Sequence, residues 1–422
     1  MDHLISLEDA RKDLFSLAAR LAENIKSADG HAGALSRIVP IYVERGEVDI
    51  AAELSDTIAD PYARDRLLTL VAEKCAANDD LDYAFQLAEA IEDDGVAAEA
   101  RERIAIRLAA GGNIDRAIET AETLDHPDNV YGELAAKFDA DGNAERRDEM
   151  IDTIEFAMAK IGALNALAAI AINEGDHKKA VTFLDRSVAV ADEVDYETDE
   201  TRALTEIGSL FVAAKRKDRA IETLDKARQI AEKIDSVHRE YLLSGVSSGF
   251  FSAGSVDLAD RVLDLITDKT HLASTLLGFS RSYWESNEKS DAVDALDEAY
   301  QILRSQAENE TRDSRSKFQL WRSIAAQFAG FEKYERAIET AQEHPDPDEQ
   351  ADALSEIAQI ATLHGQDDFA DQAYRAIDED SKRVTTLIRM ADAHVHREEI
   401  DAAKESLNAA FELADSVPQL GL

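Results

Sequence analysis

The stretch Val96–Val130, VAAEARERIAIRLAAGGNIDRAIETAETLDHPDNV, decides the fold of this chain. It predicts a first helix, a tight turn at Gly112 and a second helix. Two helices whose axes lie roughly 8–10 Å apart need small side chains where they cross. Ala105 of the first helix and Ala117 of the second, twelve positions later, are the predicted crossing pair. The stretch is therefore expected to form one helical hairpin.

The same arrangement recurs to the end of the chain. A second-helix anchor follows, by twelve residues, a small residue that is itself preceded by a large apolar one. The eleven anchors are Ala51, Ala84, Ala117, Arg147, Ala180, Ala220, Ala259, Ala292, Ala337, Ala370 and Ala403. Most lie 33 residues apart, and a fixed period of this size is typical of a solenoid whose units bury their apolar faces against their neighbours. The predicted fold class is an all-α solenoid of about eleven helix-turn-helix repeats.

Residues at fixed distances from the anchors predict how the helices begin and end. A glycine five residues before the anchor predicts a left-handed end to the first helix. These glycines are Gly46, Gly112, Gly142, Gly175, Gly254 and Gly365. An acidic residue two before the anchor suits the positive N-terminal end of the second helix. These acids are Asp49, Asp82, Asp115, Asp218, Asp257, Asp368 and Asp401. Pro61, Pro127 and Pro347, ten after an anchor, are expected to stop the second helix.

These repeats resemble the tetratricopeptide repeat (TPR) family over nearly the whole chain. A large residue stands sixteen before most anchors, as at Leu35 and Trp321, and an aromatic residue nine before several, as at Tyr42 and Phe328. The departures are the 33-residue period, Arg147 in place of an anchor alanine, and Arg101 at a large apolar position. The resemblance implies a right-handed superhelix whose first helices line a concave groove.

The ends of the chain differ from the repeats. Residues 1–30 are predicted to form an N-terminal capping helix, running from Leu7 to Lys26. A continuous TPR-like array is expected over residues 31–416, and residues 417–422 form a short tail. The first residues hold no long apolar run, so neither a signal peptide nor a membrane span is expected. The single Cys75 falls on a core position of a first helix and is expected to be buried and unreactive.

The formal net charge of −41, from 87 acidic against 46 basic residues, is the second informative feature. Such a chain repels itself at low ionic strength, whereas at molar salt the screening length falls to about 3 Å. We therefore expect a protein of a high-salt cytoplasm, as in a halophilic archaeon. An ordinary acidic mesophilic protein is the alternative.

Candidate binding residues follow from the TPR resemblance, which implies that positions fifteen, eleven and eight before the anchor face the groove. In three successive repeats these are Ser244, Ser248 and Phe251, then Leu277, Arg281 and Trp284, then Arg322, Ala326 and Ala329. Tyr, Trp and Arg are enriched in binding hot spots. The predicted groove residues are Tyr241, Phe251, Arg281, Trp284 and Arg322. The alternative is that this aromatic-rich region is core packing.

Two function classes remain open. The first is a non-catalytic scaffold that binds a peptide or helix of a partner protein, with a basic partner favoured by the acidic field. The second is an enzyme or regulatory subunit that binds a small ligand near Tyr241, Trp284 and Arg322. Nucleic acid is disfavoured as a partner by the charge, although Arg312, Arg315 and Lys317 form a local basic island.

No cofactor or metal is expected, because the sequence holds no phosphate-binding glycine loop, nucleophile elbow or zinc-ligand spacing. His394 and His396 stand two apart on a predicted helix and therefore face different sides. His126-Pro127-Asp128 and His344-Pro345-Asp346 follow identical RAIETA segments. We interpret both as inherited turn chemistry rather than as a repeated site.

Overall fold

The computed structural model describes residues 4–307 and 314–416, and within these ranges the chain forms helices and no strand. The helices are α1 (Leu7–Ala10), α2 (Leu14–Glu23), α3 (Ala28–Arg45), α4 (Val48–Asp56), α5 (Pro61–Ala77), α6 (Leu81–Ala90), α7 (Asp94–Ala110), α8 (Ile114–Ala121), α9 (Asp128–Ala140), α10 (Ala144–Thr153), α11 (Ala157–Asn173), α12 (His177–Ala191), α13 (Glu197–Ala213), α14 (Lys217–Ala231), α15 (Arg239–Ser252), α16 (Val256–Leu263), α17 (Lys269–Glu285), α18 (Lys289–Ala307), α19 (Ser314–Gly330), α20 (Tyr334–Gln342), α21 (Pro347–Leu363), α22 (Asp367–Arg375), α23 (Asp380–His396) and α24 (Ile400–Ser416). Each predicted anchor lies on an even-numbered helix from α4 to α24. The predicted α-solenoid of eleven hairpins is therefore confirmed for the described residues.

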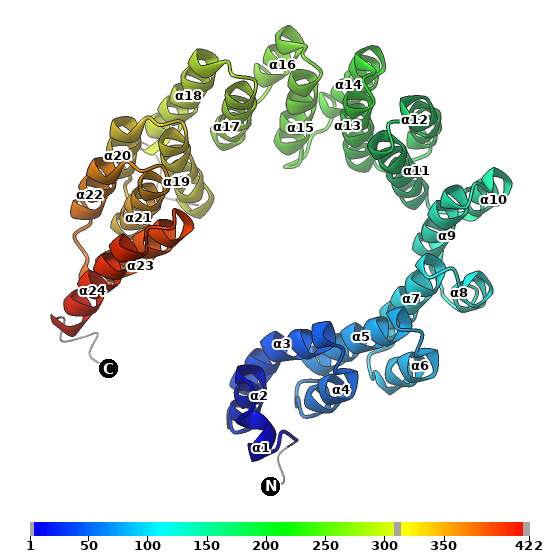
Figure 1. The fold of residues 1–422 in the computed structure, drawn as a ribbon. Coiled ribbons are helices and arrows are strands. Elements are labelled where there is room, and N and C mark those ends of the chain that lie inside the picture. The colour runs from blue at the N-terminus through cyan, green and yellow to red at the C-terminus, as the bar shows by residue number, and fades with distance from the viewer. Residues whose placement is uncertain (1–3, 308–313, 417–422) are drawn as a thin grey trace. The chain divides into compact units, whose positions relative to one another are not determined.

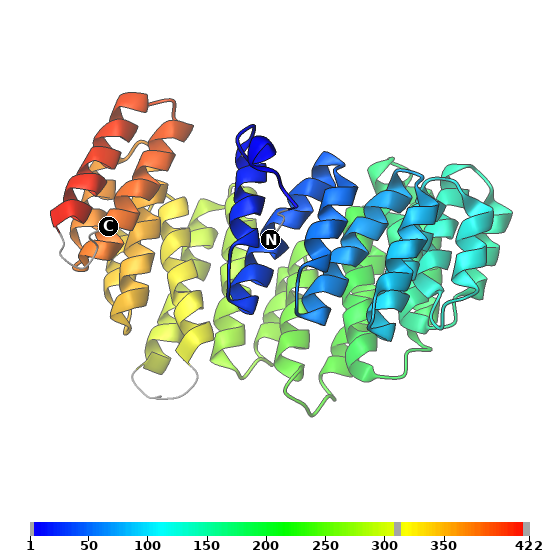
Figure 2. The same ribbon diagram turned by 90° about the horizontal axis from the view of Figure 1, so that it is seen from below.

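The chain divides into two compact units, residues 1–195 and 196–422. Within each unit the odd-numbered first helices, from α3 onward, form one layer and the even-numbered second helices form the other (Figure 1). Neighbouring helices of a unit run side by side in opposite directions, as the turned view shows (Figure 2). Each hairpin thus presents its first helix to the same side of its unit.

The predicted crossing residues are buried where the two helices of each hairpin meet. Ala105 and Ala117 are both 0% exposed, as expected where two backbones approach closely. The other anchor alanines are at most 3% exposed. The small residues recurring along the chain are therefore the contacts that set the spacing between the helices.

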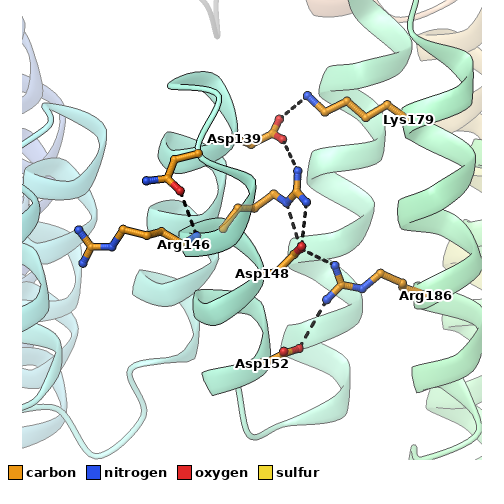
Figure 3. A network of polar contacts seen from close by, with 8 residues as sticks. Asp139, Arg146, Asp148, Asp152, Lys179 and Arg186 are labelled. Carbon is orange, nitrogen blue, oxygen red and sulfur yellow. Dashed lines mark hydrogen bonds and ion pairs between the residues drawn. The ribbon is translucent and has the colours of Figure 1, made fainter.

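Arg147 is the one anchor that is not alanine, and it replaces apolar packing by a network of charges. Its guanidinium pairs with Asp139 at 3.0 Å and with Asp148 at 3.0 Å. Asp139 also binds Lys179, and Asp148 also binds Arg186, both on α12 of the next hairpin (Figure 3). The guanidinium lies 5.1 Å from the centre of the Phe183 ring as well. A large cation is tolerated here because two carboxylates and an aromatic face surround it.

All six predicted glycines end their first helices with a positive φ, between 70° and 82°. In the other five repeats the same position also has a positive φ but carries a side chain. These residues are Asp79, Lys215, Asn287, Glu332 and Glu398, with φ between 59° and 66°. The left-handed residue thus belongs to the geometry of every hairpin turn, whereas glycine is only its least strained occupant.

We expect Gly142→Ala to lower the free energy of unfolding by about 1 kcal/mol, because alanine is strained at positive φ. An added Cβ meets nothing within 4 Å at this position, so the loss reports backbone strain alone. Glu332→Gly is expected to raise stability by up to about 1 kcal/mol. Urea denaturation measures both, and Glu332→Gln controls for the lost charge. Equal stability of the Gly and Gln variants would contradict the strain argument.

The N-terminal capping helix differs from its sequence prediction. The expected single helix over Leu7–Lys26 is wrong, because the chain breaks before Leu14. There Asp13 caps α2 by accepting hydrogen bonds from the amides of Phe15 and Ser16. These bonds and the Ser16 hydroxyl, which contributes most, hold the pKa of Asp13 at about 2.

The expected role of the prolines is also wrong. Pro61 and Pro347 occupy the first position of the next first helix, and Pro127 immediately precedes one. The second helices before them have already ended at Asp56, Gln342 and Ala121. Proline fits at a helix start because its missing N–H has no helical acceptor there.

Three acidic residues join successive hairpins by accepting hydrogen bonds from backbone amides, a contact that the sequence analysis did not predict. Asp65 accepts hydrogen bonds from the amides of Glu92 and Asp93, both at 3.1 Å. Asp128 binds the amides of residues 155 and 156, and Glu240 those of residues 267 and 268, in the same way. All three stand nineteen residues before their anchor. Burial opposes ionisation of Glu240, but the amide hydrogen bonds outweigh it and lower its pKa.

Candidate functional site

A cavity of about 390 Å³ lies between the first helices α13, α15 and α17 of the second unit. Small hydroxyl-bearing side chains make up half of its lining. They are Thr205, Ser209, Ser244, Ser248, Ser274 and Thr275. Gly245 adds a position with no side chain at all. We call this cavity the serine groove; it exists because small residues, rather than large ones, face this side of three successive first helices.

The hydroxyl groups of the serine groove are arranged to accept hydrogen bonds. Ser244 donates to the carbonyl of Glu240 at 2.9 Å, and Thr205 donates to that of Thr201 at 2.7 Å. Each hydroxyl oxygen keeps lone pairs that can accept a further hydrogen bond. Ser248 and Ser274 are exposed and make no hydrogen bond within the part of the chain that the structure describes. The groove therefore offers several polar partners to a bound chain or ligand.

Tyr241 forms the edge of the serine groove. This residue is 61% exposed, and it also lines a smaller cavity of about 140 Å³, together with Asp199 and His238. Arg202 lines both cavities and pairs with Asp199. An exposed tyrosine beside polar cavities combines a large apolar surface with a hydroxyl group, the combination that is common in binding hot spots.

Tyr241 and Phe251, two of the predicted groove residues, occupy different environments. Tyr241 lines the serine groove, whereas the half-buried Phe251 does not. The Phe251 ring stacks on Phe279 with centroids 4.1 Å apart and meets the edge of Tyr283 at 4.7 Å. Phe251 thus joins α15 to α17 through packing between rings.

Arg281 and Arg322 each connect neighbouring first helices. Arg281 is exposed and donates a hydrogen bond of 2.7 Å to Gln327 on α19. Arg322 of α19 pairs with Glu349 at 3.3 Å and with Glu356 at 3.7 Å, both on α21. Their charged groups are therefore engaged between repeats in this structure.

Trp284 lines a different cavity, of about 730 Å³, at the turn edge of the repeats. Its indole stacks on Phe331 with centroids 4.2 Å apart, and the Lys289 ammonium lies 3.4 Å from the ring centre. His364 also lines this cavity. Tyr241 and Trp284 therefore line different cavities, and Arg322 lines neither of these two.

The remaining predicted residues are placed as follows. Arg312 lies outside the described residues, whereas Arg315 is exposed and Lys317 half-buried in the first turn of α19. His394 is buried and binds Glu399 at 3.0 Å, whereas His396 is exposed, so the two do face different sides. Cys75 is 1% exposed, and burial raises its pKa to about 11. This confirms the predicted burial of the thiol and disfavours a thiolate at neutral pH.

His344, of the second His-Pro-Asp segment, is a buried part of the turn. Its Nδ1 accepts from the amide of Asp346 at 3.1 Å, and its ring contacts the edges of Phe318 and Trp321. Burial lowers the pKa of His344. Within residues 4–307 and 314–416, no cluster of three or more His, Cys, Asp or Glu could hold a metal ion. No helix among the residues described here is long and apolar enough to cross a membrane.

The positions implied by the TPR resemblance predicted part of the serine groove but not all of its lining. Ser244 and Ser248 stand at the groove positions that the TPR resemblance implied, and both line the cavity. Arg202, Gly245 and His271 also line it but attracted no attention in the sequence. The signal that could have identified the site is the recurrence of Ser or Thr fifteen and eleven residues before the anchor in two adjacent repeats. These residues are Thr205 and Ser209, then Ser244 and Ser248.

Comparisons with known proteins agree with the repeat pattern. The tetratricopeptide repeat family model matches residues 160–233, which include most of α11 and all of α12, α13 and α14. No curated protein matches the chain significantly. The family match therefore covers two consecutive hairpins, at the boundary between the two units.

Several solved structures align with this chain over most of its length. Ton1535 from Thermococcus onnurineus NA1 is 16% identical, with 84% of this chain and 98% of that chain covered and a TM-score of 0.29. The apo form of RapI is 10% identical, covering 92% and 98%, with a TM-score of 0.32. The apo quorum sensor NprR from B. thuringiensis is 12% identical, covering 76% and 99%, with a TM-score of 0.29. Scores and identities this low carry no information about a ligand. It is the sequence of residues 160–233 that matches the tetratricopeptide repeat family, as the repeat spacing predicted.

Proposed function

We propose that this protein is a non-catalytic interaction scaffold that binds an extended segment of a partner protein in the serine groove. The supporting observation is the alignment of small hydroxyl residues from α13, α15 and α17 around one cavity, with the exposed Tyr241 at its edge. Large side chains at these positions would fill the space. Small ones leave room for a ligand and supply its hydrogen-bond partners.

The spacing of the first helices suits an extended peptide. Packed helices lie about 8–10 Å apart, and an extended chain advances about 3.3 Å per residue. Every third residue of a bound segment would therefore meet a new helix. Ser209, Ser248 and Ser274 would then provide one polar group per helix. Basic residues flanking the bound segment would be attracted by the net charge of −41.

We also propose that the protein works in a high-salt cytoplasm, as expected from its charge. The excess of 41 negative charges has no cationic counterpart within the chain. Salt ions would have to screen it.

The groove is tested by filling it with a large side chain. Ser248→Trp places an indole in the cavity and is expected to weaken partner binding by about 100-fold or more, since the segment can no longer enter. Tyr241→Ala is expected to weaken binding by at least about ten-fold. Partners are identified by affinity capture from a high-salt lysate and mass spectrometry, and their affinities are then measured by calorimetry.

Gln229→Trp is the matched control. Gln229 is exposed on α14, a second helix of the same unit, and does not line the groove. Partner binding is expected to survive this change, and circular dichroism establishes that each variant is folded. A partner that binds wild type and Ser248→Trp equally well would exclude the serine groove as its binding site.

A further inference from the structure

Large apolar side chains are exposed mainly in the first and last helices of the chain. Among the described residues, 21 large apolar residues are exposed, of which seven lie within residues 4–25 and five within residues 388–411. A capping element of a repeat array is expected to have a polar outer face, which keeps the end of the stack soluble. Clustered apolar residues on such a face are typical of a contact surface.

The last first helix, α23, exposes repeat positions that contact the next hairpin elsewhere in the chain. Val395 stands eight residues before its anchor, as Phe251 and Trp284 do. Each of these two rings stacks on an aromatic ring of the following hairpin. Ile388 stands fifteen before its anchor, as does Arg322, which pairs with two glutamates of the next first helix. No hairpin follows α24 among the described residues, and Ile388 and Val395 are half exposed.

Leu407 and Phe411 continue this surface onto α24. Leu407 stands four residues after its anchor, as does the buried Leu224. Leu224 lies so close to Gly249 of the next first helix that a Cβ on this glycine would collide with it. Phe411 is equivalent to Tyr300, whose ring packs against the indole of α19 with centroids 5.5 Å apart. We call the four exposed residues Ile388, Val395, Leu407 and Phe411 the C-terminal face.

At the other end, α2 has the register of a second helix that lacks a long first helix before it. Ala18 stands 33 residues before the anchor Ala51, and only the four-residue helix α1 precedes α2 among the described residues. Leu21 stands three after Ala18 and is 61% exposed. The equivalent residues of the next two repeats, Leu54 and Leu87, are buried. The side of α2 that would pack on a preceding helix is therefore uncovered.

Three exposed leucines form one stripe along this side of α2. Leu14, Leu17 and Leu21 are three and four residues apart, so they lie on the same side of the helix. All three are exposed, whereas Ala19 and Ala22 are buried on the opposite side. We call the three leucines the N-terminal face.

The charges favour contact between the two different faces over contact between two like ones. Residues 4–27 contain four acidic and four basic residues and carry no net charge. Helices α23 and α24, from Asp380 to Ser416, contain eight acidic and five basic residues. Two C-terminal faces would therefore bring like net charges together, whereas the neutral N-terminal end can approach without net repulsion.

We propose that the N-terminal face of one copy of this chain packs on the C-terminal face of a second copy. In this contact α2 takes the place that the next first helix has inside the array, where the equivalent positions contact a first helix. The contact joins two different surfaces, so each pair keeps one free face of each kind and can add further copies. It lies at the ends of the array and does not depend on the serine groove.

Two variants each block one face. Leu14→Glu with Leu21→Glu places two carboxylates on the N-terminal face, and Leu407→Glu with Phe411→Glu places two on the C-terminal face. All four residues are exposed helix positions, and glutamate is a good helix former, so both variants are expected to fold. Because an unpaired carboxylate is costly to bury, each variant is expected to weaken the contact by about 100-fold or more.

Sedimentation velocity of the full chain in about 2 M KCl, where screening is strong, measures the assembly. The mass of wild type is expected to rise above that of the monomer as its concentration is raised about 100-fold. Each blocked variant alone is expected to stay monomeric, because every copy then lacks the same face. An equimolar mixture of the two is expected to form a particle of twice the monomer mass, because one intact face of each kind is present.

Tyr196→Glu with Val237→Glu is the matched control. It removes two exposed apolar residues that belong to neither face and adds the same charge. This control and Ser248→Trp, which fills the serine groove, are both expected to assemble as wild type does, and circular dichroism checks that every variant is folded. A monomeric wild type, a blocked variant that associates by itself, a mixture that stays monomeric, or a folded control that fails to assemble would each overturn the proposal.

Discussion

Asp65→Ala is expected to lower the free energy of unfolding of the first unit by about 3 kcal/mol. The Asp65 side chain is 0% exposed and binds the amides of Glu92 and Asp93 as well as the guanidinium of Arg64. Removing the carboxylate leaves two backbone donors and a partly buried cation without their acceptor. Because these donors belong to the linker between α6 and α7, the contact between two hairpins is lost together with the bonds.

The expected loss is measured by urea denaturation, and hydrogen exchange locates it. The amides of Glu92 and Asp93 are expected to exchange faster in Asp65→Ala, because their acceptor is gone. Asp65→Asn keeps one acceptor oxygen and is expected to lie between wild type and alanine. Asp94→Ala, an exposed acid in the first turn of α7, is the control and is expected to cost about 0.5 kcal/mol. Equal losses for Asp65→Ala and Asp94→Ala would show that the buried contact adds nothing.

The fold could be predicted because the close approach of paired helices requires small residues at fixed positions of the sequence. Only small side chains fit where paired helices cross, so Ala105 and Ala117 mark the same contact in sequence and structure. The turn glycines were predictable for a similar reason, since the left-handed conformation favours them. Glu332 and Lys215 also take that conformation. Neither residue type indicates it, because the two flanking helices impose it.

The acidic contacts between hairpins were not predictable. An aspartate among 87 acidic residues carries no information by itself, and Asp65 differs from exposed acids only through a fold that turns it inward. The break before Leu14 did have a local signal, Asp13 followed by Ser16, which is a capping arrangement. The regular apolar pattern around it suggested one continuous helix instead.

For the candidate sites, position along the repeat was more informative than residue type. The positions fifteen and eleven before the anchor led to Ser244 and Ser248 of the serine groove. Aromatic density drew attention to Phe251 and Trp284, whose rings stack on other aromatic rings. Cavities in a repeat protein depend on which positions hold small residues, and a search for large hot-spot residues overlooks them.

The second large effect expected is on thermal stability, which is predicted to rise by about 10 °C or more between roughly 50 mM and 2 M KCl at pH 7. Salt screens attraction and repulsion alike, so the sign of the effect depends on which is larger. The chain has 87 acidic and 46 basic residues, so 41 carboxylates lack a cationic partner even if every basic residue pairs with one carboxylate. Exposed pairs such as Arg375–Asp371 contribute little, about 1 kcal/mol or less. Repulsion among the excess carboxylates is therefore expected to dominate.

Measurements at lower pH distinguish repulsion between carboxylates from the general effect of salt on apolar burial. Near pH 4.5, the isoelectric point of the sequence, the net charge approaches zero, and the dependence on KCl is expected to shrink strongly. Asp13, with a pKa of about 2, remains ionised there, and the lowered pKa of Glu240 keeps this carboxylate more ionised than an ordinary glutamate. A rise in melting temperature of the same size at both pH values would attribute the effect to apolar burial instead. The same melting temperature in 50 mM and 2 M KCl at pH 7 would contradict the proposal of a high-salt environment. Repulsion among the unpaired carboxylates would then not lower the stability measurably at low salt.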